Sequence, residues 1–498
     1  MNGNSVLPRS RIQYVFVLVL ENHSFDQMLA LSGIPGVDGA TTANFNSYLG
    51  TQYPVQGNAP ASMPDDPGHE FADTLEQLAG PGQTYPPGGP YPAIDNSGFV
   101  ANYAVAGKSG SAVLGDIMKC FDTRSQLPVI YQLATEFVVC DHWFASMPGP
   151  TWPNRFFLHG ASSNGLDHSP SMQDIGLWEA TGFTYPQGSI FDALTARRIG
   201  WRLYRDEDGP MEGRIPQACA LHNIHLWDFC DVGTFAADLN KTYPWRYTLI
   251  EPNYGAVAST YEGGSSQHPL DGVARGEALM AKLYESLRNS PLWNESLLII
   301  TYDEHGGFYD HVAPGAAPAP ADGGERSPWN ESQFTFTQLG VRVPALVISP
   351  WLQPGVDSTI YDHASILATV ESLFGVPALT ERDRGANPIH GLDVAGVLRT
   401  DCPTQLEQPA AAPARAPLAA VQQAALDAEP IPDRSSTVGF LGVARKTDHE
   451  LSAPGAEQEA RRAAFAGIRT RGHAREYMQD VLQRAEARRL SGGSGGTP

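Results

Sequence analysis

Acidic and amide side chains follow two apolar segments that lie far apart in the sequence. Residues 15–22 read VFVLVLEN and residues 297–304 read LLIITYDE. The four polar side chains at their ends are Glu21, Asn22, Asp303 and Glu304. Apolar runs without alternation are typical of strands buried on both faces of a parallel sheet, and ligands bind at the carboxyl ends of such strands. Adjacent carboxylates repel one another unless a cation lies between them, so the pattern predicts a divalent metal site built from both segments.

A hydroxyl group lies in a second segment with potential chemistry, PGPTWPNR at residues 148–155. Its first three residues predict a rigid turn, and Pro153 suits the first turn of a helix. Two interpretations of Thr151 are open. Its hydroxyl could cap the helix, or it could be a nucleophile held beside the helix amides. In the second case Asn154 and Arg155 are available to bind phosphate oxygens.

The elements that position these groups alternate between helix and strand. A helix at 190–198 precedes a strand at 201–204, and an amphipathic helix around 278–287 precedes the strand at 297–304. A further buried strand is predicted at 343–350. This alternation is typical of an α/β fold with a parallel sheet.

The composition is that of a large folded protein without a basic surface. The chain has 498 residues, of which 42% are hydrophobic and 17% charged, and its 50 glycines and 40 prolines indicate many loops on a regular scaffold. A formal net charge of −21 argues against nucleic acid as a partner. It does not exclude a small phosphate ester, because a bound metal can reverse the local potential.

The five cysteines include no C-x-x-C pair and no zinc spacing. Their odd number predicts mostly reduced thiols, although one bridge between Cys219 and Cys230 stays open. No secretory signal is visible, and no segment approaches the roughly 20 apolar residues of a membrane span. We therefore expect a soluble protein without a membrane span, either cytoplasmic or exported by a non-Sec route.

A change of composition near Cys402 predicts three parts. A catalytic domain occupies residues 1–400, and an Ala/Pro-rich linker or loosely packed strap follows at 401–436. Residues 437–498 regain a helical pattern and form a C-terminal extension. We expect the extension to pack beside the core or to mediate assembly.

Four motifs together resemble a known family. They are ENHSFDQ at 21–27, GPTWPNR at 149–155, QHP at 267–269 with a downstream ARGE, and TYDEHGGFYDHV at 301–312. The chain is similar, from about Tyr14 to Leu392, to the bacterial phosphoesterases that include non-hemolytic phospholipases C and AcpA-type acid phosphatases. The resemblance implies a three-layer α/β/α sandwich like that of alkaline phosphatase, with loop-rich insertions and the C-terminal helical extension.

The resemblance also implies roles for individual residues. One divalent ion, Ca, Mg, Mn, Fe or Zn, would be held by the four side chains at the strand ends. Thr151 matches the family nucleophile, and His69 and His268 match histidines near the phosphoryl group that would protonate the leaving alcohol and activate water. Two positions depart from the family pattern: His23, where Arg is frequent, and Gln27, where His is frequent. These departures concern the substrate rather than the reaction.

These observations predict a metal-dependent phosphoesterase that acts on a small phosphate ester or a phospholipid headgroup through a phosphothreonine. Phosphodiester and monoester substrates are both open. Trp143, Trp152 and Tyr309 fit either an aromatic box for choline or core packing. An inactive binding protein of the same fold is disfavoured by the full set of polar groups. A sulfatase is disfavoured because Thr151 cannot supply a formylglycine.

Overall fold

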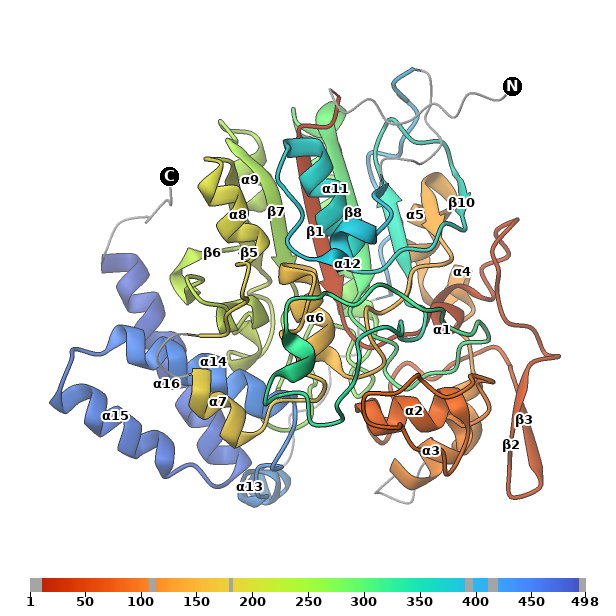
Figure 1. The fold of residues 1–498 in the computed structure, drawn as a ribbon. Coiled ribbons are helices and arrows are strands. Elements are labelled where there is room, and N and C mark those ends of the chain that lie inside the picture. Colours follow the sequence, from red (N-terminus) through yellow and green to blue (C-terminus); the bar gives the residue numbers. More distant parts are fainter. Residues whose placement is uncertain (1–10, 107–112, 179–181, 390–396, 411–419, 492–498) are drawn as a thin grey trace.

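A computed structural model of the chain describes residues 11–106, 113–178, 182–389, 397–410 and 420–491 (Figure 1). Its main sheet contains β1 (Tyr14–Leu20), β4 (Val138–Cys140), β5 (Gly200–Arg205), β6 (Phe229–Asp231), β7 (Trp245–Glu251), β8 (Ser296–Tyr302), β9 (Ala345–Ile348) and β10 (Gly355–Asp357). The order of the eight strands is β10-β4-β9-β8-β1-β7-β5-β6. A separate antiparallel hairpin consists of β2 (Phe45–Tyr48) and β3 (Thr51–Pro54).

The two apolar runs are neighbouring strands at the centre of the sheet. β1 and β8 are parallel, with Leu20 opposite Tyr302, and β7 lies on the other side of β1. Every residue of β8 is buried, and so is every residue of β1 after Tyr14. The register therefore places Glu21 and Asp303 side by side at the same edge of the sheet.

The sheet is mixed rather than parallel. β9, which falls in the strand predicted at 343–350, pairs antiparallel with both β8 and β4. All four of its residues are buried. A buried apolar run looks the same in either direction, so the burial of this strand was predictable and its direction was not.

Helices cover both faces of the sheet. The α-helices are α1 (Phe25–Leu29), α2 (Phe71–Ala79), α3 (Phe99–Ala106), α4 (Thr123–Gln126), α5 (Pro128–Glu136), α6 (Thr151–Gly160), α7 (Met172–Trp178), α8 (Ile190–Ala196), α9 (Phe235–Leu239), α10 (Ala274–Arg288), α11 (Ala364–Phe374), α12 (Glu381–Gly385), α13 (Ala420–Ala428), α14 (Ser436–Leu451), α15 (Ala456–Ala466) and α16 (Arg471–Ser491). One layer joins α5, α10 and α9, and the other joins α8, α6 and α11 (Figure 1). The predicted three-layer α/β/α architecture is confirmed.

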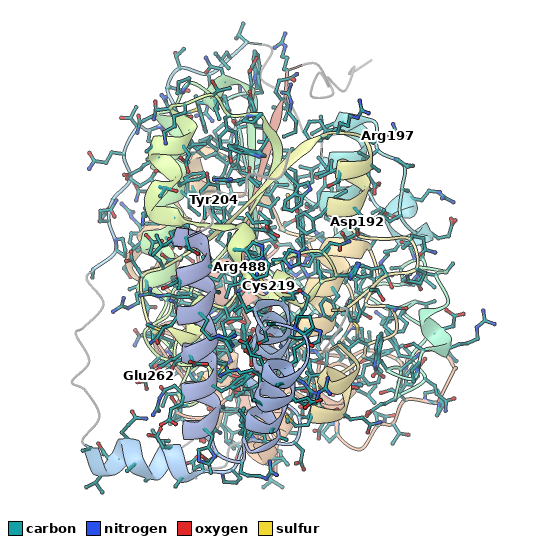
Figure 2. All side chains as sticks on the ribbon, turned by 90° about the vertical axis from the view of Figure 1, so that its left-hand side faces the viewer. Asp192, Arg197, Tyr204, Cys219, Glu262 and Arg488 are labelled. Carbon is teal, nitrogen blue, oxygen red and sulfur yellow. The ribbon has the colours of Figure 1, made fainter. Side chains whose placement is uncertain are left out.

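The C-terminal region lies against the rest of the molecule. Residues 402–406 contact α10. Tyr284 of this helix donates a hydrogen bond of 2.6 Å to the carbonyl of Pro403. The predicted linker contains α13, and its residues 411–419 lie outside the described chain. α14 packs against α6 and the 3-10 helix around Cys219 (Figure 2), and its buried apolar residues belong to the same core as the sheet.

Two further expectations concern the cysteines and a membrane-spanning helix. All five cysteines are free thiols, so Cys219 and Cys230 do not form a bridge. No described helix is both long and apolar enough to cross a lipid bilayer.

Candidate active site

Two strand-end loops meet where β1 and β8 finish. Asn22 has a left-handed backbone (φ 63°), which asparagine tolerates better than most residues, and its N–H donates to Asp303 Oδ1 at 3.1 Å. Gly306 also has a positive φ of 63°, and a Cβ there would lie 2.1 Å from the carbonyl oxygen of Asn22. The loop after β8 therefore passes so close to the loop after β1 that only glycine fits at this position.

Thr151 faces these loops from the start of α6. The N-cap position belongs to Pro150, and no side chain caps the helix. The Thr151 hydroxyl donates instead to Asn22 Oδ1 at 3.2 Å, and the residue is 1% exposed. The capping interpretation of Thr151 is therefore wrong, and its hydroxyl lies against a predicted metal ligand.

Asn154 and Arg155 both bond to protein atoms. The Asn154 side chain bonds to backbone groups of the turn that precedes α6. Arg155 donates to Asp303 Oδ2 at 3.0 Å, to Tyr254 Oη at 2.9 Å and to the carbonyl of Leu20 at 3.0 Å. These contacts position the turn and the strand ends, and the substrate-binding role of the two residues stays a prediction.

The carboxylates at the strand ends include oxygens without donors. Glu21 is 1% exposed, and neither its Oε2 nor Glu304 Oε1 has a hydrogen-bond partner. Burial raises the pKa of Glu21 to about 8 against the opposing effect of Arg155, and the neighbouring carboxylates Asp303 and Glu304 raise it further. Buried, unsatisfied carboxylate oxygens beside the amide oxygen of Asn22 form the oxygen donor set that suits a hard divalent cation.

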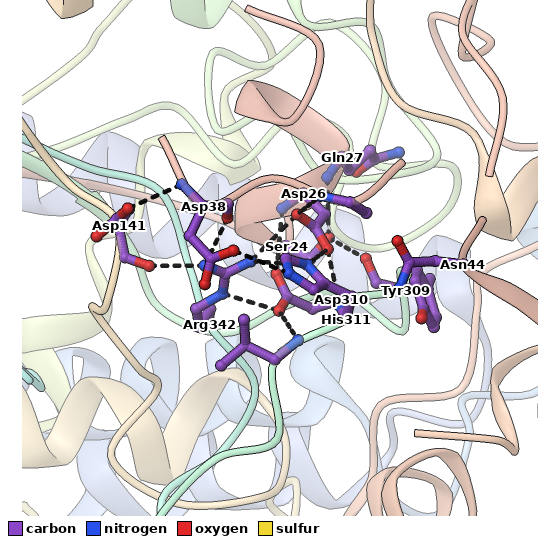
Figure 3. A network of polar contacts seen from close by, with 12 residues as sticks. Ser24, Asp26, Gln27, Asp38, Asn44, Asp141, Tyr309, Asp310, His311 and Arg342 are labelled. Atoms are coloured by element: carbon purple, nitrogen blue, oxygen red, sulfur yellow. Dashed lines mark hydrogen bonds and ion pairs between the residues drawn. The ribbon is translucent and has the colours of Figure 1, made fainter. Parts of the chain in front are cut away.

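A second acidic group lies nearby and has a different character. In the described chain, ligand atoms of Asp26, Asp310 and His311 lie within 4.8 Å of one another, whereas the three carboxylates at the strand ends form no such group. Arg342 lies among them and donates to Asp310 Oδ1 at 2.8 Å and to Asp26 Oδ1 at 3.1 Å (Figure 3). His311 Nδ1 lies 2.7 Å from Asp26 Oδ2. Arg342 pairs with both carboxylates and His311 with one of them, so this cluster ties α1 to the loop after β8 without needing a cation.

His69 lies against the predicted metal ligands. Its Nδ1 is 3.2 Å from Asn22 Nδ2 and 3.5 Å from Glu304 Oε1. Burial lowers its pKa, but Glu304 and then Asp66 outweigh burial and raise the pKa to about 9. Asn22 thus connects His69 to the hydroxyl of Thr151.

His268 occupies a separate position in the same region. It is 3% exposed, stacks on Tyr261 with ring centroids 4.0 Å apart, and accepts the Leu270 N–H at Nδ1 (3.3 Å). Burial lowers its pKa to about 4, so it is neutral near pH 7 with its proton on Nε2, 3.8 Å from Asp66 Oδ2. His69 and His268 line one cavity of about 470 Å³.

This cavity also has walls that the motifs did not predict. Thr151 is not among its lining residues and connects to it through Asn22 and His69. One wall comes from the C-terminal region. Its residues are Pro432, Arg434, Ser435, Ser436, Thr437 and Arg471.

The two positions that depart from the family pattern contact each other. His23 Nδ1 lies 2.5 Å from Gln27 Oε1, and its Nε2 lies 2.8 Å from the carbonyl oxygen of Gln267. The His23 ring stacks on Phe308 at 5.4 Å, and burial lowers its pKa to about 4. Both residues are buried and neither lines the cavity.

The three aromatic residues considered for a choline-binding box pack in the interior. Trp143 and Trp152 belong to the main hydrophobic core, and Tyr309 belongs to a second buried cluster. None of them lines the cavity. The packing interpretation is therefore the one that the structure supports.

Sequence reasoning missed three residues of this region. Tyr254 links Arg155 to Glu251, His363 Nε2 lies 2.6 Å from the Asp303 carbonyl oxygen, and Asp66 faces both histidines. Asp66 lies three residues before His69, Tyr254 three residues after β7, and His363 immediately before α11. These positions do not indicate which distant residue each side chain will meet.

Comparison with known proteins adds an independent observation. A sequence model of the Phosphoesterase family matches residues 12–377. The chain is 37% identical to non-specific phospholipase C6 of Arabidopsis thaliana over 82% of this chain and 77% of that protein. It is 28% identical to phospholipase C B of Mycobacterium tuberculosis H37Rv over 74% of each.

Solved structures with similarity include an alkaline phosphatase superfamily protein from Vibrio parahaemolyticus, with 15% identity and a TM-score of 0.31 over 72% of this chain and 77% of that one. That score is too low to add to the fold described above. The assignment to a family therefore rests on the sequence matches, and the relatives include plant as well as bacterial proteins. The chain belongs to the phosphoesterase family and is a hydrolase of phosphate esters.

Proposed function

We propose that the chain cleaves phosphate esters by transferring the phosphoryl group to Thr151. One divalent cation would be held by the oxygens of Glu21, Asn22, Asp303 and Glu304. The observation that carries this proposal is the hydrogen bond from the Thr151 hydroxyl to Asn22 Oδ1, beside two buried carboxylate oxygens without a hydrogen bond: Glu21 Oε2, and Glu304 Oε1, which His69 Nδ1 faces at 3.5 Å. A bound cation would neutralise these carboxylates and lower the pKa of the hydroxyl.

The chain's own residues account for the remaining steps. Thr151 Oγ1 would lose its proton to solvent and attack phosphorus as the alkoxide; a new P–O bond forms in line, and the bond to the leaving alcohol breaks. His69, on the cavity wall, gives a proton to the leaving oxygen and, once neutral, takes one from the water that attacks the phosphorylated Thr151 and releases the threonine. His268 lies on the same wall, and because it is neutral with its proton on Nε2 it would not be the acid. Arg155 orients Asp303 through their ion pair at 3.0 Å.

We further propose a phosphodiester of the phospholipid type as the substrate. The relatives named phospholipase C support this choice. A cavity of about 470 Å³ with charged and hydroxyl groups in its lining suits the polar part of such an ester better than its acyl chains. A phosphate monoester is the second candidate, because the predicted reaction at phosphorus is the same.

The test is hydrolysis of p-nitrophenyl phosphate and p-nitrophenylphosphorylcholine, with and without EDTA. We expect turnover of the choline diester, its loss in EDTA and its return with added divalent metal. Turnover of the monoester alone would make the protein a phosphatase. Full activity after exhaustive chelation would contradict the metal dependence.

The nucleophile is tested by Thr151→Ala, with Thr151→Ser as the matched control. Because the alanine removes the attacking oxygen, we expect turnover to fall by about 10⁴-fold with an unchanged melting temperature. The serine keeps the oxygen and should retain measurable turnover. Trapped ³²P-labelled phosphoenzyme should appear with wild type and be absent with alanine, and wild-type rates in Thr151→Ala would end the covalent mechanism.

A further inference from the structure

The cavity is completed by residues that lie beyond the matched family region. That region ends at residue 377, yet residues 432–437 and Arg471 line the same space as His69 and His268. The C-terminal region therefore does more than pack beside the core, because it supplies a wall of the candidate active site.

One ion pair holds this wall at its exposed end. Arg434 Nη2 lies 2.7 Å and 2.8 Å from the two carboxylate oxygens of Glu331. The backbone of Arg434 pairs with Ser171, and the N–H of Ser435 donates to the carbonyl of Pro170 at 3.3 Å. The Arg434 and Glu331 side chains are 36% and 50% exposed, so both remain accessible to solvent.

The other end of the wall has buried anchors. Thr437 Oγ1 donates to the carbonyl of Val257 at 2.6 Å, and Arg471 Nη1 donates to the carbonyl of Ser259 at 3.1 Å. These bonds fix the starts of α14 and α16 against the segment that carries Tyr261. The Arg434–Glu331 pair thus ties residues 432–437 to the loop that carries Glu331.

Glu331 itself is held on a fixed loop. The Asp167 carboxylate accepts the N–H groups of Glu331 and Ser332 at 3.2 Å and 2.7 Å. The imidazole of His168 lies 3.7 Å from Glu331. Glu331 therefore presents its carboxylate to Arg434 from a rigid support rather than from a free loop.

We propose that Arg434, anchored by Glu331, is a specificity-determining residue that fixes residues 432–437 against the leaving alcohol of the ester. This inference rests on the proposed function, in which His69 protonates that alcohol. The wall lines the same cavity as the two histidines, so a large leaving group bound beside His69 would reach it. Without the Arg434 side chain, the backbone contacts of residues 434–435 and the Thr437 anchor remain, but the exposed end of the wall is held less firmly. This weakens binding of a large leaving group more than that of a small one.

The experiment compares two substrates that share the phosphocholine group and differ in the leaving alcohol. They are p-nitrophenylphosphorylcholine and dihexanoylphosphatidylcholine below its micelle concentration. For Arg434→Ala and Glu331→Ala we expect kcat/KM for the lipid, relative to the p-nitrophenyl ester, to fall about fivefold, chiefly through KM. The exchange variant Arg434→Glu with Glu331→Arg should restore the ratio, because the ion pair is rebuilt in reverse.

The matched control is Arg469→Ala. Arg469 is an exposed arginine of the same region that bonds only to neighbouring carbonyls and does not line the cavity. It should leave the substrate ratio unchanged.

An unchanged ratio in both single variants would overturn the inference. An equal fall for both substrates, accompanied by a lower melting temperature, would also overturn it, because the pair would then be only structural. Failure of the wild-type protein to turn over either substrate with added metal would instead overturn the proposed function, and this inference with it.

Discussion

Asn22 is the residue through which the candidate nucleophile reaches the rest of the site. Its amide oxygen accepts the Thr151 hydroxyl, its amide nitrogen lies beside His69, and its backbone N–H donates to Asp303. Its left-handed φ of 63° aims these three groups in different directions. One polar side chain in an uncommon backbone conformation thus fixes the relation between nucleophile, histidine and carboxylate.

Arg155 has a structural role that its motif did not reveal. Arg155→Met would leave the Asp303 carboxylate fully buried without its ion pair, so we expect the free energy of unfolding to fall by about 3–5 kcal/mol. Urea denaturation measures this loss. Arg326→Met, which removes an exposed pair with Glu325, should change it by less than about 0.5 kcal/mol. A loss of under about 1 kcal/mol for Arg155→Met would show that Asp303 finds another partner.

At the scale of elements, the site depends on the close approach of the loops after β1 and β8. Gly306→Ala would place a methyl group 2.1 Å from the Asn22 carbonyl oxygen at a positive φ. We expect it to lower the free energy of unfolding by about 2 kcal/mol or more and to reduce turnover, because Asn22 must move.

Gly315→Ala is the control for this substitution, since a Cβ there would meet no atom within 4 Å. Thermal unfolding and initial rates of the two variants give the comparison. Wild-type activity and stability in Gly306→Ala would mean that the loops separate readily.

The hydrogen-bonded segment 167–174, which contains Asp167, His168 and Asp174, makes the stability of the protein depend on pH. Burial disfavours the charged form of His168, but its hydrogen bonds to Asp167 and Asp174 raise its pKa to about 9. Because this pKa lies above the unfolded value, the stabilisation is fully present below about pH 6.5 and disappears as the pH rises through about 9.

We therefore expect His168→Gln to lower the free energy of unfolding by about 3 kcal/mol at pH 6 and by much less at pH 10. Chemical denaturation of both proteins at the two pH values measures the difference. A loss that is equal at pH 6 and pH 10 would mean that the histidine contributes by packing alone.

At the scale of the molecule, local sequence patterns predicted the helices and strands well, but they predicted the contacts between distant segments poorly. The apolar runs and their polar ends predicted β1, β8 and the polar side chains that meet at their ends, because burial and strand termination are written in adjacent residues. That these side chains bind a metal stays a prediction. The antiparallel direction of β9, the contact of His363 with Asp303 and the wall at 432–437 depend on which distant segments meet. A single sequence records each segment without recording its partner.

The central position of β1 has a consequence for how the protein is made. Both neighbours of β1 in the sheet come late in the chain, since β7 begins at Trp245 and β8 at Ser296. At ribosomal rates of about 5–20 residues per second, this apolar strand waits roughly 10–50 s before its first partner has been synthesised. During that interval it has two unpaired edges, which are prone to pair with other chains. We therefore expect the nascent protein to depend on chaperones that shield its first strand, and its yield to respond to translation speed before Trp245.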